Sequence, residues 1–247
     1  VVAYNAGQGA LHFERPPGLF SFMNVERNLV LPLVVRPGIE RVADLRGRTL
    51  AVDAVGTGFS FVLREILRVH GLAPEDYSLA PVGNARARLA ALERGDYAGA
   101  VLNAPFDAAA VAAGLKVVAS SRDAFADYQG TTFITTRAWA AAHESELVGF
   151  IKAMLRAMRW VRDPANAEAA ADLLLRHMKG LDAARAARAV AALARNLTPD
   201  FNRAGIETVL ALRRRYGTPP ADLGTAADHV ETRYLAAARA ALGAEEG

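Results

Sequence analysis

The sequence contains no cysteine, and this absence excludes several kinds of chemistry at once. The chain cannot form a disulfide, use a thiolate nucleophile, or bind zinc or an iron–sulfur cluster through sulfur. Histidine is also scarce, with five in the chain, and none has a His or carboxylate partner at a spacing typical of metal sites. We therefore expect no metal and no other cofactor.

Long apolar runs are absent as well. The most apolar region, Ala98–Ser120, is interrupted by Asn103, Pro105, Asp107 and Lys116. A transmembrane helix needs roughly 20 consecutive apolar residues, so this region does not span a membrane.

Lysine is rare, since only three of the 29 basic residues are lysines, and the net charge is +3. The arginines are scattered among acidic residues and do not alternate with aromatic ones, so we expect no nucleic-acid partner. Hydrophobic residues make up 52% of the chain and charged residues 22%, a balance that excludes a disordered, collagen-like or coiled-coil protein. The 247 residues suffice for one large α/β domain or two packed lobes.

Short β-type runs alternate with helical segments through the first half of the chain, which predicts βαβ units and an open, mostly parallel sheet. Pro32 cannot donate to a strand ladder, so its strand is expected at an edge or in a crossover. The predicted strands are Leu19–Met23, Leu29–Val35, Thr49–Asp53, Ser78–Val82, Ala98–Leu102, Leu115–Ala119 and Thr131–Thr135.

After Thr136 the pattern is helical to the end of the chain. An apolar stripe from Leu147 to Val161 predicts one long helix that faces a core. The further predicted helices are Ala165–Lys179, Asp182–Leu197, Asn202–Tyr216 and Thr225–Leu242.

The two patterns predict two lobes, one inserted into the other. Residues 34–132 form the inserted α/β lobe, and residues 1–33 with 133–247 form the first lobe, because neither flank alone has a sheet-plus-helix core. Two crossover strands connect the lobes, and a ligand-binding cleft is expected between them.

The stretch from Asp53 to Ser60 is the best candidate for a ligand site. A strand ends there, a turn with Gly56 and Gly58 follows, and a helix begins, so free N–H groups and a positive helix end are available to an anionic group. Thr57 or Ser60 adds a hydroxyl donor. The alternative is a plain turn in which Thr57 caps the helix. The third glycine of a dinucleotide fingerprint is missing, and no phosphate-binding loop occurs.

Three other polar positions lie where strands meet the predicted cleft. Asn103 follows a strand end and could offer its amide to a ligand or cap a turn. Thr131 begins the returning strand and could present its hydroxyl, although threonine is also a favoured strand residue. Asn24 and Glu26 belong to a polar cluster before the first crossover, which could equally be a solvated turn. Catalytic signals are weak, because the chain has no G-x-S-x-G motif and no clustered acid–base residues.

Several segments resemble solute-binding proteins of ABC transporters, in the group that binds nitrate, sulfonates or thiamine precursors. The resemblance rests on the run Leu31–Val35, the Asp-Leu-Arg-Gly-Arg-Thr segment at Asp44–Thr49, and the small-residue turn that opens the next helix. Ala90–Leu102, which reads as helix, glycine, acidic residue and strand, is similar to a further element of the family.

This resemblance implies the type II periplasmic-binding-protein fold, with closure of two lobes about Leu29–Val35 and Thr131–Thr135. It also implies that Gly56, Thr57, Gly58 and Asn103 face the ligand. The chain is then expected to be a monomeric, periplasmic or lipid-anchored protein that passes a small organic, possibly anionic, ligand to a membrane permease. No signal segment is seen, and Val1–Ala10 resembles the end of a longer opening stretch.

Two other functions fit the same fold. One is an enzyme such as a menaquinone-pathway-like dehydratase, for which Asp53 and Glu26 are the candidate acid or base. The other is the effector-sensing domain of a transcription regulator, although no helix-turn-helix precedes the sheet.

Overall fold

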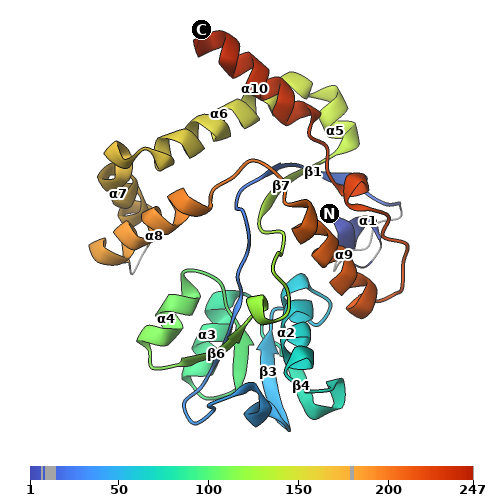
Figure 1. Ribbon diagram of the computed structural model, residues 1–247, viewed down its shortest axis with the longest axis vertical. Helices are drawn as coiled ribbons and strands as arrows, with labels where there is room; N and C mark the ends of the chain where they lie inside the picture. Colours follow the sequence, from blue (N-terminus) through green and yellow to red (C-terminus); the bar gives the residue numbers. More distant parts are fainter. Residues whose placement is uncertain (7, 9–14, 179–180, 247) are drawn as a thin grey trace.

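Strands and helices alternate through the first half of the chain, as the sequence pattern predicts (Figure 1). The structure is a computed structural model that describes residues 1–6, 8, 15–178 and 181–246. The end of the helix predicted over Ala165–Lys179 and part of the stretch Val1–Ala10 lie outside the described residues. The strands are β1 (Leu19–Asn24), β2 (Pro32–Val35), β3 (Arg48–Val52), β4 (Tyr77–Pro81), β5 (Gly99–Val101), β6 (Lys116–Ser120) and β7 (Thr132–Thr136).

The helices dominate the second half of the chain. They are α1 (Val2–Asn5), α2 (Gly58–Val69), α3 (Ala85–Glu93), α4 (Phe106–Ala112), α5 (Arg137–Ala142), α6 (Glu144–Arg162), α7 (Ala167–His177), α8 (Ala183–Asn196), α9 (Arg203–Tyr216) and α10 (Arg233–Glu246). The prediction of a single helix over Thr225–Leu242 is wrong. A short 3-10 helix, η5 (Ala226–His229), precedes α10, because Val230 leaves the helical path to bridge with Ser21 of β1.

The larger sheet has the order β4-β3-β5-β2-β6. β3 pairs in parallel with β4 and β5, whereas β2 is antiparallel to β5 and β6. Four of the five strands therefore point the same way, and the mostly parallel sheet is confirmed for this part. Of the two expected places for Pro32, the edge strand is wrong, because β2 has a partner on each side, whereas the crossover agrees with the passage of the chain from β1 of the other sheet into β2. Pro32 is tolerated as the first residue of the strand.

The other sheet is an antiparallel pair, β1 and β7, with Leu19 opposite Thr136 and Asn24 opposite Thr132. A mostly parallel sheet in this part of the chain was therefore a wrong expectation. Phe20 and Phe22 of β1 pack against Ile151 of α6 and its neighbours, so helices supply most of this core. Because Thr132–Thr136 belongs to the pair, the returning crossover lies before it, and the predicted crossover at Thr131–Thr135 is too late in the chain.

The inserted part has its own core around α2. Phe61, Val62, Leu63, Ile66 and Leu67 are all at most 1% exposed, as the helical periodicity of this segment predicts. These side chains lie against apolar residues of β2, β3 and β5.

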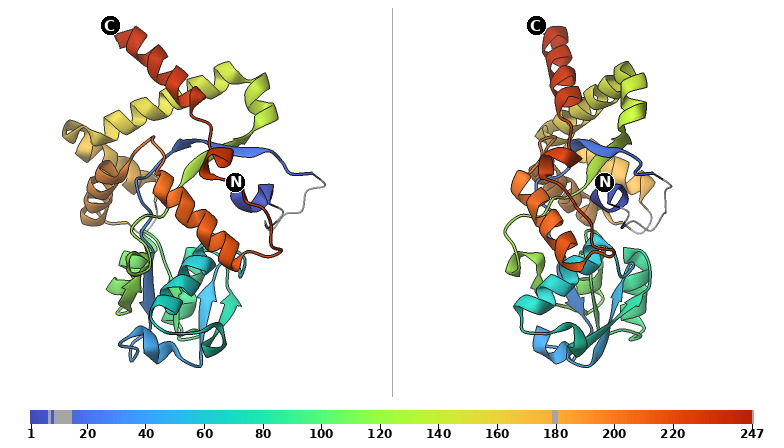
Figure 2. Two further views of the ribbon diagram at one scale, coloured as in Figure 1. Left: turned by 45° about the vertical axis from the view of Figure 1, so that its right-hand side comes forward. Right: turned by 90° about the vertical axis from the view of Figure 1, so that its right-hand side faces the viewer.

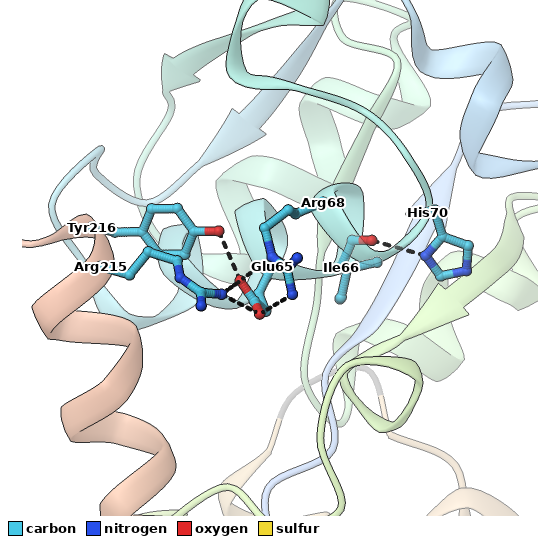
Figure 3. A network of polar contacts seen from close by, with 6 residues as sticks. All are labelled: Glu65, Ile66, Arg68, His70, Arg215 and Tyr216. Carbon is cyan, nitrogen blue, oxygen red and sulfur yellow. Dashed lines mark hydrogen bonds and ion pairs between the residues drawn. The ribbon is translucent and has the colours of Figure 1, made fainter.

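Helix α9 packs across α2, although the two helices are far apart in sequence (Figure 2). Leu212 of α9 is buried in the core around α2. Beside it, the Glu65 carboxylate accepts hydrogen bonds from Arg68, Arg215 and Tyr216 (Figure 3). Glu65 and Arg68 belong to α2, whereas Arg215 and Tyr216 end α9. We call this group the α2–α9 joint.

Candidate functional site

Four strands of the larger sheet have their carboxyl ends at the edge where the crossovers arrive. β2 begins directly after the outgoing crossover, and β3, β4, β5 and β6 run in the opposite direction, so their carboxyl ends lie at the edge where the crossovers arrive. In open α/β sheets ligands bind beyond these ends. Helices α2, α3 and α4 also begin there, and their first N–H groups point toward the same edge.

The turn between β3 and α2 is held by Thr57. Its hydroxyl donates to Asp53 Oδ1 at 2.6 Å and accepts from the Ser60 N–H at 3.2 Å. Thr57 is thus the N-cap of α2, as the alternative interpretation of this turn predicts. Ser60 is completely buried, and the described part of the chain offers its hydroxyl no hydrogen-bond partner.

The two glycines of this turn have different surroundings. Gly56 is exposed, and a Cβ added to it would have no atom within 4 Å. A Cβ on Gly58 would lie 2.8 Å from the Tyr128 hydroxyl oxygen. Gly58 is therefore needed for the close approach of Tyr128, a residue of the returning crossover, to the start of α2.

The Asp53 carboxylate lies near two polar side chains, those of Thr57 and Arg88. Arg88 Nη1 is 4.0 Å from its Oδ1 atom and donates to the Gly83 carbonyl oxygen at 2.8 Å. Arg88 is 1% exposed, so burial lowers the pKa of its guanidinium, and the charge of Asp53 opposes this shift. The buried Arg88 and the half-buried Asp53 thus place an ion pair at the predicted ligand edge.

Asn103 follows β5 and is half-buried. Its side-chain Nδ2 atom donates weakly to the Ala104 carbonyl oxygen at 3.3 Å. The backbone carbonyl oxygen of Asn103 accepts from the Phe106 N–H at 2.9 Å. The side-chain carbonyl of Asn103 has no recorded donor in the described part of the chain, so this residue keeps hydrogen-bonding capacity for a ligand.

At the ends of the crossovers, Thr131 and Asn24, the last residue of β1, form hydrogen bonds with other protein groups. The Thr131 hydroxyl donates to Glu26 Oε1 at 2.8 Å. Asn24 is fully buried, and its Nδ2 atom donates to the carbonyl oxygens of Glu26 and Asp200 at 2.8 and 2.9 Å. Its Oδ1 atom accepts from Gln129 Nε2 at 2.7 Å. Asn24 thereby orients the Gln129 side chain.

Gln129 is held from the other side by α9. The Asn202 N–H donates to Gln129 Oε1 at 3.2 Å. A Cβ on Gly205 would lie 2.7 Å from the Gln129 backbone nitrogen, so the start of α9 touches the crossover directly.

A cavity of about 240 Å³ lies beside Gln129, between the returning crossover, β1, α1, α9 and η5. Its polar lining residues are Ser21, Tyr128, Gln129, Thr132, Arg213 and His229. Its apolar lining residues include Val2, Phe201, Ile206, Val209 and Val230. A mixed wall of this kind, with a few placed polar groups on an apolar surface, is typical of small-molecule sites.

Tyr128 joins this cavity to the predicted ligand edge, since it lines the cavity and also lies against Gly58. Burial raises the pKa of Tyr128 to about 12, Arg213 opposes the shift, and Asp53 adds to it. Arg213 and Asp53 are therefore both within electrostatic reach of the Tyr128 hydroxyl. The candidate site comprises the cavity and the adjoining turn at Asp53–Gly58.

Sequence reasoning did not find Tyr128, Gln129 or Arg213. The first two directly precede Gly130 and Thr131, so the same strand-end argument extended by two residues would have included them. No local sequence pattern marks Arg213 as a site residue, because it is one of three consecutive arginines on a helix. Within the described ranges no three His, Asp or Glu side chains are grouped so as to hold a metal ion.

Known proteins share the fold of this chain. The NMT1-like family matches residues 39–175. The nitrate-binding protein NrtA from Synechocystis PCC 6803 superposes with a TM-score of 0.76 at 13% identity, over 98% of this chain and 73% of that one. The alkanesulfonate-binding protein SsuA from Xanthomonas axonopodis pv. citri, bound to MOPS, gives 0.69 at 19% identity, over 87% and 74%.

An enzyme shares the same fold. The desulfurization enzyme DSZB superposes with a TM-score of 0.65 at 16% identity, over 97% of this chain and 83% of that one. No curated protein gives a significant match. At these identities the superpositions show the fold and leave the ligand open.

Proposed function

The chain belongs to the NMT1-like family, and on this premise we propose that it is a solute-binding protein that takes up a small organic ligand between two lobes. We take residues 34–132 as one lobe and residues 1–33 with 133–247 as the other. The observation that carries the proposal is the cavity beside Gln129, which is lined from the returning crossover, β1 and α9. The fold that the chain shares with NrtA and SsuA supports it.

Binding in this site would couple to closure of the lobes. Tyr128 and Gln129 lie on a crossover, so a ligand that contacts them and the Asp53–Gly58 turn bridges both sides of the hinge. Contacts made only in the closed arrangement shift the population toward it. Asp53, Gly56, Thr57, Gly58 and Asn103 would provide the inserted lobe's side of the site.

Asn24 and Thr131 have a different proposed role on the crossovers. Asn24 would act through Gln129, which it orients, and Thr131 would act through its hydrogen bond to Glu26. Both are thus proposed to position the ligand contacts.

We further propose that the protein works outside the cytoplasm as a monomer and delivers its ligand to the permease of an ABC transporter. The described helices include none that is long and apolar enough to cross a bilayer. Delivery is the role that the family resemblance implies, and the permease would contact the two lobes in their closed arrangement.

We propose binding without chemical conversion. The chain has no cysteine for covalent catalysis. His229 lies on the cavity wall. Its Nε2 atom is hydrogen-bonded to the Leu223 carbonyl oxygen at 2.6 Å, and its buried Nδ1 atom has no hydrogen-bond partner in the described part of the chain. The fold of DSZB favours an enzyme as the second candidate.

A thermal-shift screen of the full chain tests this function, with alkanesulfonates, aromatic carboxylates and pyrimidines as probes. We expect at least one class to raise the melting temperature, because a ligand that binds only the native state stabilises it by RT ln(1 + [L]/Kd). Mass spectrometry of the recovered probe should show it unchanged. If no compound raises the melting temperature, solute binding is wrong, and if the probe is converted, the enzyme alternative is favoured.

A further inference from the structure

The outer edge of β7 has no partner strand in the described part of the chain. β7 pairs with β1 on its other side, and this two-stranded sheet lies beneath α5, α6 and α10 (Figure 1). The N–H and C=O groups along an unpaired edge are a template for a further strand. Most sheets have about four to six strands, and two alone are marginally stable.

The other sheet edges in the described ranges are protected. Lys116 places a charge on β6, and Pro81 ends β4, and these are the two outer strands of the larger sheet. The outer edge of β1 is covered after η5, where Ser21 bridges with Val230. Proteins use charges, prolines and covering segments to protect such edges from pairing. β7, with the sequence Thr-Phe-Ile-Thr-Thr, has neither a charge nor a proline.

An apolar groove of about 540 Å³ lies along this free edge, and we call it the β7 groove. Its described lining residues are all uncharged, and they are Leu19, Phe22, Phe133, Ile134, Thr135, Thr136, Trp139, Leu147 and Phe150. The rings of Phe22, Phe133 and Phe150 lie between 5.1 and 6.1 Å apart and form its floor. The groove shares none of these residues with the cavity beside Gln129.

Three large apolar side chains of the β7 groove are exposed to water. Ile134 of β7 is 46% exposed, Trp139 of α5 is 43% exposed, and Phe150 of α6 is 42% exposed. Single exposed apolar residues are common, whereas a cluster of them marks an interaction surface. Successive side chains of a strand point to opposite faces, so a strand paired with β7 would place every second side chain in the groove.

An extended strand with apolar side chains at alternate positions fits this surface. The free edge of β7 needs hydrogen bonds from another backbone, and the uncharged groove favours apolar side chains. Proteins of the same fold contain the polypeptide to supply such a strand. NrtA superposes on 98% of this chain with 73% of its own, so about a quarter of NrtA has no counterpart here.

We propose that the β7 groove is the docking site of a further β-strand, which is supplied by polypeptide outside residues 1–247. This strand pairs with β7 as the third strand of the sheet and covers Ile134, Trp139 and Phe150. Backbone hydrogen bonds hold it, and its apolar side chains in the groove fix its register. The docking site is separate from the proposed ligand site and does not depend on the proposed function.

A strand peptide tests the docking site, with Trp139 as the reporter. The chain has two tryptophans, so Trp160→Phe leaves Trp139 as the only one. The probe is an eight-residue peptide with a lysine at each end and three Val-Thr pairs between them. We expect its titration to shift the Trp139 emission to shorter wavelengths until it saturates, because the added strand removes water from the indole ring.

Backbone methylation distinguishes strand pairing from a nonspecific apolar contact. The N–H groups of successive residues in a strand point to opposite sides, so only every second one reaches β7. One version of the peptide carries N-methyl groups on its valines, and another carries them on its threonines. One version should bind at least about tenfold more weakly than the parent peptide, and the other should bind as the parent does. Any other pattern, or a parent peptide that does not bind, overturns the docking site.

Two substitutions at exposed strand positions locate the binding. Ile134→Lys places a charge beside the free edge of β7 and should weaken binding of the parent peptide at least about tenfold. Val117→Lys is the matched control, because Val117 is 42% exposed on β6, an edge strand of the larger sheet. This variant should bind as the wild type does, and unchanged melting temperatures check that both variants fold. Equal affinities in the two variants would place the peptide elsewhere and overturn the inference.

Hydrogen exchange tests the source of the strand. In the protein purified from its own organism, the amide hydrogens of β7 should exchange at least about tenfold more slowly than in the isolated chain of residues 1–247. Equal exchange rates would overturn the inference. Light scattering of the isolated chain tests a second copy as the occupant. A dimer that Ile134→Lys converts to a monomer would show that a second copy fills the groove, and the proposed source would be wrong.

Discussion

At the scale of single residues, the candidate site contains a close contact between Gly58 and Tyr128. Tyr128 is 6% exposed and fills the space that a Gly58 side chain would need. The tyrosine thereby forms the boundary between the cavity and the start of α2. The sequence predicts Gly58 as a ligand-binding position, and the structure shows that its lack of a side chain leaves space for Tyr128.

Gly58→Ala should displace the Tyr128 ring from the cavity wall. The added Cβ would lie 2.8 Å from the hydroxyl oxygen, so the tip of the tyrosine must move. We expect the affinity for a ligand identified by the screen to fall about tenfold, with a loss of about 1 kcal/mol in the free energy of unfolding, at the low end of overpacking effects. Calorimetric titration and urea unfolding measure the two quantities.

Gly56→Ala is the control for this substitution, because its Cβ would meet no atom within 4 Å. It should leave both affinity and stability unchanged. Equal affinities in the two variants would show that the position of Tyr128 does not matter for binding.

At the scale of elements, the α2–α9 joint explains how a late helix becomes part of an early core. Burial alone would raise the pKa of Glu65, but hydrogen bonds from Arg68, Tyr216 and Arg215 outweigh it and lower the pKa to about 2 (Figure 3). The carboxylate of the folded protein is therefore charged at neutral pH. Its hydrogen bonds link the end of α9 to α2.

Glu65→Gln should destabilise the protein by about 2–3 kcal/mol at pH 7, because hydrogen bonds to a charged group are replaced by weaker ones. A carboxyl group whose pKa is lowered on folding stabilises the native state above its ordinary pKa, here 4.5, and loses that contribution as the pH falls toward about 2. The difference between wild type and variant, measured by urea unfolding, should narrow below pH 4.5.

Glu93→Gln provides a matched comparison, since Glu93 is exposed at the end of α3. We expect its effect to stay within about 0.5 kcal/mol at every pH. A Glu65→Gln effect that does not change between pH 7 and pH 3 would contradict the role of the charged carboxylate.

At the scale of the whole molecule, a third segment accompanies the two crossovers. The Thr198 N–H donates to the Val25 carbonyl oxygen at 3.0 Å, and the Arg27 N–H donates to the Asn196 carbonyl oxygen at 2.8 Å. Helix α9 follows this segment directly and is fixed to α2. In the proposed closure we therefore expect α9, although it lies within residues 133–247, to move together with the inserted part, relative to α6 and α10.

Spin-label distances test this arrangement, and the absence of cysteine means that introduced cysteines are the only labelling sites. Glu75→Cys combined with Ala153→Cys reports the distance from the inserted part to α6. Glu75→Cys combined with Ala211→Cys reports the distance to α9. All three positions are exposed. With a ligand from the screen we expect the first distance to shorten and the second to stay constant. A change confined to the second pair would place the hinge between α2 and α9.

Much of the fold could be predicted because hydrophobic periodicity is a local property. The buried face of α2, the strand–helix alternation and the helical second half follow from residues a few positions apart. The β1–β7 pairing and the break at Val230 could not be predicted in this way, since each depends on a partner more than 100 residues away. For the candidate site, the strand-end rule predicts the Asp53–Gly58 turn, which stays a prediction, and it stops short of Tyr128.

The sequence by itself determined the α/β class, the order of the elements and the exclusion of thiol chemistry. Tertiary structure decided the burial and the contacts of individual side chains. Positions 213, 214 and 215 are all arginine. Packing alone decides that Arg213 lines a cavity, that the exposed Arg214 donates to the Gly224 carbonyl oxygen, and that Arg215 pairs with a carboxylate. The physical reason is that the energy of a charge depends on its burial and its partners, and both are set by residues distant in the chain.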